Sequence, residues 1–130
     1  MTKPQLVAAA LAVVAVLIFD TVAAAIAKGG GGAYRWFGIL EIVLYLAIGF
    51  MGARATGTWR GGLGVVVIAA VAEVTLGWYV SSLVGPGAVP AGTSLATIAS
   101  VGLIAIVWNG IIGLAGALIG ARFARTTEPR

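Results

Sequence analysis

Four long apolar segments set the narrowest limits on what this chain can fold into. They cover residues 6–27, 36–53, 63–84 and 95–121. The length of each segment is close to or above the roughly 20 helical residues that are needed to cross a hydrocarbon core of about 30 Å. We therefore predict an all-α fold, a four-transmembrane-helix bundle that forms a single integral membrane domain over residues 1–130.

The composition supports a membrane location and disfavours an enzyme. The chain is 61% hydrophobic and only 9% charged, which leaves more apolar side chains than a soluble domain of 130 residues can enclose. It has no Cys and no His, so it lacks thiolate chemistry, the commonest metal ligand and the usual base at physiological pH. No serine stands in a nucleophile-elbow pattern. We expect no enzyme activity, no cofactor and no resident metal site.

The basic residues fall unevenly between the two sides of the predicted bundle. One side receives Lys3, Arg54, Arg60, Arg122, Arg125 and Arg130, and the other receives only Lys28 and Arg35. By the positive-inside tendency, we expect both termini in the cytoplasm and a multi-pass protein of the cell (inner) membrane. The net charge of +4 favours anionic lipid headgroups over nucleic acid, because no basic stripe is interleaved with aromatic residues.

The first apolar segment also has features of a secretory signal. Lys3 precedes the apolar run, and the stretch VAAAIA offers small residues for cleavage. Residues 6–19 already fill the upper end of a signal core, so we interpret the segment as a genuine span.

The two connections on the less basic side have the composition of exterior loops. The first holds four glycines at positions 29–32, and no Lys-Ser/Thr pair follows them, so a linker is favoured over a phosphate cradle. The second is rich in Pro and Gly, and Thr93 or Ser94 is placed to cap the fourth helix.

The second and fourth segments end alike. Residues 46–54, LAIGFMGAR, align without a gap with residues 114–122, LAGALIGAR, and in this register Glu41 falls on Asn109. The match suggests two helix hairpins related by a parallel repeat about an axis along the membrane normal. The alternative is that Gly-Ala-Arg recurs wherever small residues meet a cytoplasmic boundary.

Polar residues inside the segments fall at two predicted depths. With a rise of about 1.5 Å per residue, Glu73 and Asn109 lie near the bilayer midplane, with Tyr45 at a similar level. Asp20 and Glu41 lie roughly 8–10 Å below the outer ends of the first two helices. These depths suggest an outer acidic vestibule of Asp20 and Glu41 above a midplane proton or cation site of Glu73, Asn109 and Tyr45. The alternative is that Asp20 and Glu41 are hydrated from the outer boundary and only pair locally with Lys28 or Arg35.

Glycines share helix faces with these polar residues, at steps of three and four. The residues at these steps are Glu41, Tyr45, Gly49 and Gly52 in the second segment, and Asn109, Gly113, Gly116 and Gly120 in the fourth. Small residues let helices approach closely in lipid, and Gly116 with Gly120 forms a GxxxG motif. We expect the stripe of the fourth helix either to form a homodimer or to pack that helix within its own bundle.

No basic residue lies at the predicted depth of Glu73, so this carboxyl group has no salt-bridge partner there. An ionised carboxylate in apolar surroundings is costly unless it is protonated, hydrated or matched by a cation. Exchange of a proton for a cation at such a group is the usual logic of carboxylate-driven transport. The opposing interpretation is that a protonated Glu73 bonds Asn109 and only holds two helices together. Trp108 would add an aromatic wall if it pointed inward.

Two functional hypotheses follow from these observations. The first is a small proton- or cation-linked transporter or channel that uses intramembrane carboxylates and works as a homo-oligomer, because four short helices enclose little volume. The second is a non-transporting membrane subunit or assembly partner that docks other helices through glycine-rich faces. A carboxyl of Glu73 that is connected to water would favour transport, and a dry, fully paired one would favour the subunit.

Overall fold

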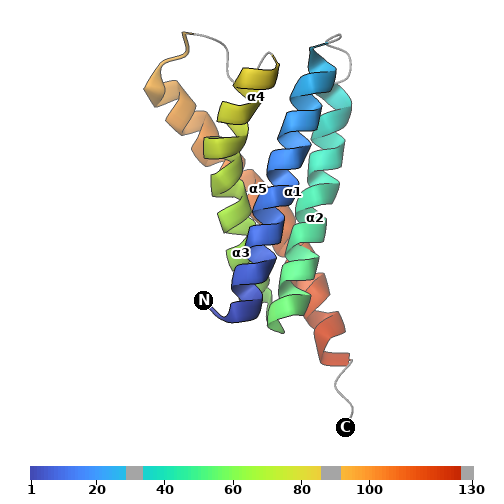
Figure 1. Cartoon of the computed structure of the whole chain (residues 1–130). Coiled ribbons are helices and arrows are strands. Elements are labelled where there is room, and N and C mark those ends of the chain that lie inside the picture. Colours follow the sequence, from blue (N-terminus) through green and yellow to red (C-terminus); the bar gives the residue numbers. More distant parts are fainter. Residues whose placement is uncertain (29–33, 86–91, 127–130) are drawn as a thin grey trace.

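The computed structural model describes residues 1–28, 34–85 and 92–126 (Figure 1). The glycine linker at positions 29–32, most of the second outer loop and Arg130 lie outside the described residues, as do the side chains of Arg35 and Arg125. The helices are α1 (Lys3–Ala27), α2 (Tyr34–Thr56), α3 (Trp59–Ala72), the π-helical turn η1 (Glu73–Gly77), α4 (Trp78–Val84) and α5 (Leu95–Thr126).

The prediction of an all-α bundle with four membrane-crossing helices is confirmed. Four helices are long and apolar enough to span a bilayer, and they cover Lys3–Ala27, Trp36–Thr56, Trp59–Val84 and Leu95–Ala124. The third of these is one continuous rod made of α3, η1 and α4. The helices extend a few residues beyond the predicted spans, because polar residues at the ends remain helical.

Side-chain caps fix where three of the helices begin. The backbone N–H of Gln5 donates to the hydroxyl of Thr2 at the start of α1, and Gly61 donates in the same way to Thr58 at the start of α3. At the start of α5, Ser94 is one of the two predicted caps, and its hydroxyl accepts from the N–H of Thr97 at 3.2 Å. These bonds satisfy donors that the first helical turn leaves free.

The ends of the helices divide the charges between the two ends of the bundle. The start of α1, the link from α2 to α3 and the end of α5 lie at one end, where they carry Lys3, Arg54, Arg60 and Arg122 (Figure 1). Lys28 follows α1 at the opposite end. The guanidinium of Arg60 lies 5.4 Å from the centre of the Trp59 ring, as suits an anchor in a headgroup layer. The cytoplasmic placement of the basic end stays a prediction.

Helix α5 crosses the other helices obliquely and packs most extensively against α2 (Figure 1). Glycines bring the two backbones together along this crossing. A Cβ atom on Gly49 would collide with the carbonyl of Gly113, one on Gly116 with the carbonyl of Leu46, and one on Gly120 with the carbonyl of Phe50. The stripe on α5 is therefore used within the chain's own bundle. We call this contact the α2–α5 glycine seam.

Gly52 points away from this seam and serves the next interface. A Cβ on Gly52 would lie 3.1 Å from the Cβ of Val65, so this glycine sets the spacing of α2 and α3. Gly113 lends its carbonyl to the seam but faces α3 as well, because a Cβ there would collide with the side chain of Val66. All five glycines predicted to pack helices thus lie at helix contacts, three facing across the seam and two facing α3.

Candidate functional site

Three buried polar side chains meet between the helices. Tyr45, Glu73 and Asn109 expose 0%, 6% and 1% of their surface. The hydroxyl of Tyr45 donates to Oε2 of Glu73, and Nδ2 of Asn109 donates to the same oxygen at 3.0 Å. One carboxyl oxygen therefore accepts two hydrogen bonds from neutral donors on two other helices.

Glu41 joins this group from the outer half of α2. Its Oε1 accepts a hydrogen bond of 3.0 Å from Nδ2 of Asn109. The amide nitrogen thus bridges the carboxyl groups of Glu41 and Glu73. Because both hydrogen bonds are 3.0 Å long, the two accepting oxygens lie no farther apart than twice this length. The sequence placed Glu41 at a separate outer level with Asp20, and the structure instead links it to the midplane residues. We call Glu41, Tyr45, Glu73 and Asn109 the polar cluster.

The packing of three helices positions the polar cluster. Glu41 and Tyr45 are one turn apart on α2, Asn109 comes from α5, and the glycine seam fixes the distance between these two helices. The ring of Tyr45 is part of the apolar core, together with Val65, Val66, Ala69 and Ala70 of α3. A phenol that is packed on its ring and bonded at its hydroxyl has little freedom, which favours a fixed geometry around Glu73.

Glu73 is the first residue of the π-helical turn η1. Short π-helical turns inside α-helices are rare and often lie at functional sites. The hydroxyl of Thr75 donates to the carbonyl of Val71 at 2.7 Å and to that of Ala72 at 3.3 Å, and so bonds backbone groups at the entry to this turn. Sequence analysis did not predict η1, because a π turn has no compositional signature that distinguishes it from an α-helix.

Asp20 of α1 lies beside the polar cluster and is not bonded into it. A Cβ on Gly77, the last residue of η1, would collide with Oδ2 of Asp20, so the missing side chain is what admits the carboxyl group. This Oδ2 atom is buried and has no hydrogen-bond partner among the described residues. The same Cβ would lie 3.6 Å from Cγ of Glu73, so the side chains of Asp20 and Glu73 both reach Gly77. The structure therefore brings three acidic residues into one region within the bundle.

No basic side chain balances these acids within the described part of the chain. The partners bonded to Glu41 and Glu73 are a phenol and an amide, which carry no charge. Lys3, Arg54, Arg60 and Arg122 belong to the ends of their helices. The described residues also contain no group of three or more acidic, His or Cys side chains arranged to hold a metal ion.

Trp108 does not line the site, because it is 58% exposed on the outer face of α5. The predicted aromatic wall is therefore absent from the described residues of the site.

The predicted repeat of helix hairpins has contacts for and against it. The hydrogen bond from Asn109 to Glu41 joins two positions that the sequence repeat makes equivalent. The helix contacts are not symmetric, however, because α3 packs on α2 whereas α1 has no comparable contact with α5 in the described ranges. The parallel repeat stays a prediction.

Comparison with known protein families, with curated proteins and with solved structures finds no match.

Proposed function

We propose that the protein is a small proton- or cation-linked transporter or channel, in which Glu73, Glu41 and Asp20 bind the transported ion in turn. The observation that carries this proposal is the buried oxygen of Asp20, which has no hydrogen-bond partner among the described residues and lies against Gly77 next to the side chain of Glu73. A buried polar atom without a partner is uncommon in folded proteins and requires an explanation. A proton or cation that visits these groups supplies one.

The arrangement of the acids suits transfer between neighbouring sites. Each ionised carboxylate in the membrane interior needs a neutralising proton or cation. Glu41 and Glu73 share one amide donor, so an ion that leaves one carboxyl group finds the other within reach. Asp20 and Glu41 belong to the outer halves of their helices and would connect this pair to the outer surface. A proton is favoured over a metal ion, since the described acids do not form a metal-binding group.

The second candidate is a non-transporting membrane subunit in which the polar cluster only holds helices together. It is favoured by the burial of Glu73 and by the two hydrogen bonds to its Oε2. It does not explain three acids that have no basic partner among the described side chains, since a single carboxyl bonded to Asn109 would hold the same helices. The docking role of the glycine faces also loses support, because the glycine seam is filled within the bundle.

Proton flux into liposomes tests the proposal. The purified chain is reconstituted with a pH-sensitive dye inside the vesicles, and flux is driven by a potassium diffusion potential. The test variant is Glu73→Gln, which keeps the shape of the side chain and removes its titration. The matched control is Glu128→Gln, the same exchange in the C-terminal tail. Circular dichroism and size-exclusion chromatography establish that each variant is folded and show whether it forms the expected homo-oligomer.

We expect wild-type flux, at least a tenfold loss in Glu73→Gln, and wild-type flux in Glu128→Gln. Flux that is unchanged in a folded Glu73→Gln variant would remove Glu73 from the pathway. Absence of proton flux from the wild type, and of flux for sodium, potassium and a lipophilic cation in parallel assays, would leave the subunit as the better hypothesis.

A further inference from the structure

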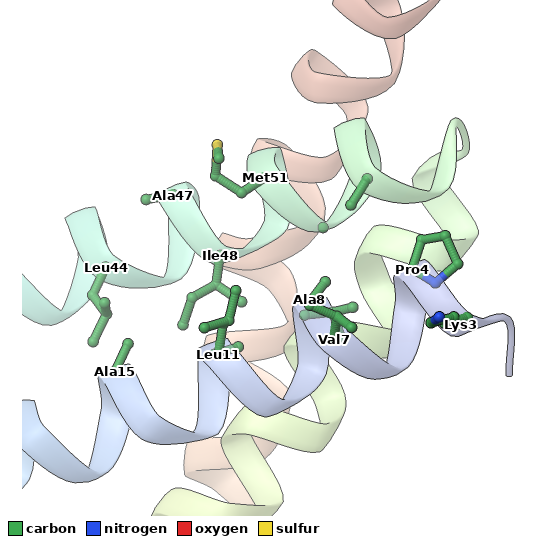
Figure 2. Close-up of a pocket in the computed structure, with 14 residues that line it drawn as sticks. Lys3, Pro4, Val7, Ala8, Leu11, Ala15, Leu44, Ala47, Ile48 and Met51 are labelled. Carbon is green, nitrogen blue, oxygen red and sulfur yellow. The ribbon is translucent and has the colours of Figure 1, made fainter.

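An apolar groove runs between α1 and α2, towards the end of the bundle that carries Lys3 (Figure 2). Its volume is about 740 Å³, within the roughly 300–1,000 Å³ of typical ligand pockets. Ala15 and Leu44 lie at its inner end, and Lys3 lies at its other end beside Pro4. No residue of the polar cluster lines it, so the groove is a separate feature of the protein.

Small side chains keep the groove open. Ala8 and Ala15 contribute to its lining from α1, and Ala47 contributes from α2. At these positions neither helix projects a side chain large enough to fill the space between them. Leu11 and Met51 also line it and leave 66% and 62% of their surfaces exposed. The groove is therefore open along the side of the bundle, where its apolar lining would face lipid.

The chemistry of the lining selects the ligand. Lys3 carries the single charge among the 14 lining residues, and the others have apolar side chains or none. Lys3 also lies in the first turn of α1, where the helix adds a partial positive charge. A hydrocarbon chain matches the apolar lining of the groove, and an anionic group matches its Lys3 end. A cationic amphiphile would meet the same positive charge and is disfavoured.

A helix of a second copy is a poorer fit. A helix with its side chains is about 10–12 Å across, whereas this groove is the hollow left by alanines between two helices that contact each other. A single acyl chain is much narrower and can follow the groove towards Leu44.

We propose that this groove binds an anionic phospholipid, with one acyl chain between α1 and α2 and the phosphate against Lys3. The bound chain would fill the space between the helix that carries Asp20 and the helix that carries Glu41 and Tyr45. The proposal does not depend on transport, and it holds equally for a structural subunit.

Native mass spectrometry of the full chain in a non-ionic detergent tests this inference. Equal amounts of dioleoyl phosphatidylglycerol and dioleoyl phosphatidylcholine are added, and the retained lipid adducts are counted. Ala47→Phe fills the groove from an exposed position on α2, and Lys3→Gln removes the charge. The matched controls are Ala115→Phe, at the exposed repeat-equivalent position on α5, and Lys28→Gln, at the opposite end of α1.

We expect the wild type to retain the anionic lipid about fivefold over the zwitterionic one, as one lysine near the lipid surface provides. Lys3→Gln should abolish this preference and Ala47→Phe should remove both adducts, while both controls should behave as the wild type. Equal retention by the two phenylalanine variants would overturn the groove as the lipid site. A preference unchanged in Lys3→Gln would overturn the contact with the phosphate. A dimer that Ala47→Phe dissociates, without competition from lipid, would assign the groove to a second copy.

Discussion

Replacement of glycine by alanine should have opposite effects at two positions of α5. At Gly110 a new Cβ would meet nothing within 4 Å, whereas at Gly116 it would collide with the backbone carbonyl of Leu46. Both positions lie inside the same helix, so both variants should gain the same stability from the higher helix propensity of alanine. The difference between the two variants therefore measures the close approach of α2 and α5.

The contacts set the size of this difference. Alanine in place of glycine in a helix interior stabilises by roughly 0.5–1 kcal/mol, and this gain should appear undiminished in Gly110→Ala. Overpacking costs about 1–3 kcal/mol, and a backbone carbonyl cannot rotate away as a side chain does, so Gly116→Ala should fall in the upper part of that range. The net loss for Gly116→Ala is then about 1–2 kcal/mol. The two variants should differ by about 2 kcal/mol or more, which is roughly 30-fold in the unfolding equilibrium.

Reversible unfolding in mixed micelles, with increasing fractions of sodium dodecyl sulfate and helix content as the signal, gives both free energies of unfolding. If Gly116→Ala proves as stable as Gly110→Ala, the backbones of α2 and α5 do not approach as closely as the glycine seam requires. The placement of Asn109 against Glu41 and Glu73 would then need revision, since the seam sets it.

The same unfolding assay tests two further expectations. Gly77→Ala should destabilise the protein by about 1 kcal/mol, the lower end of the overpacking range, because the Asp20 carboxyl that it would meet is the end of a side chain and can rotate away. A double-mutant cycle should show most of that cost disappearing in an Asp20→Ala background, and an equal cost in both backgrounds would place Asp20 elsewhere. Tyr45→Phe removes one hydrogen bond to Glu73 and should cost about 0.6 kcal/mol, while Asn109→Ala removes two bonds and should cost about twice as much. Equal losses in these two variants would mean that the bond from Asn109 to one of its carboxyl partners contributes nothing.

Much of the fold could be predicted from the sequence because membrane spans depend on length and polarity alone. The cap at Ser94 and the glycine positions followed from local rules that hold in any helix. The helices are longer than the predicted spans, since the second helix continues past residue 53 to Thr56 and the third begins at Trp59, ahead of residue 63. Apolar windows do not register a polar residue that stays helical at a membrane boundary.

The candidate site could be predicted in part. Steps of three and four correctly placed Glu41 and Tyr45 on the glycine-bearing face of α2, and Asn109 on that of α5. The division into two depths was less accurate, because counting the rise per residue treats all helices as upright and α5 crosses obliquely. The close approach of Asp20 to Gly77 depends on which way two different helices face each other. A periodicity within one helix does not contain that information.

The length of α5 links the polar cluster to the thickness of the surrounding bilayer. The helix has 32 residues, so at about 1.5 Å per residue it extends about 48 Å, against a hydrocarbon core of about 30 Å. A helix longer than the core is thick tilts, or projects from it, by an amount that depends on the lipid. Because α5 crosses α2 at the glycine seam and carries Asn109 next to it, we expect a change in the tilt of α5 to change the angle at which the amide meets Glu41 and Glu73. Lipid chain length should then act on the polar cluster without contacting it.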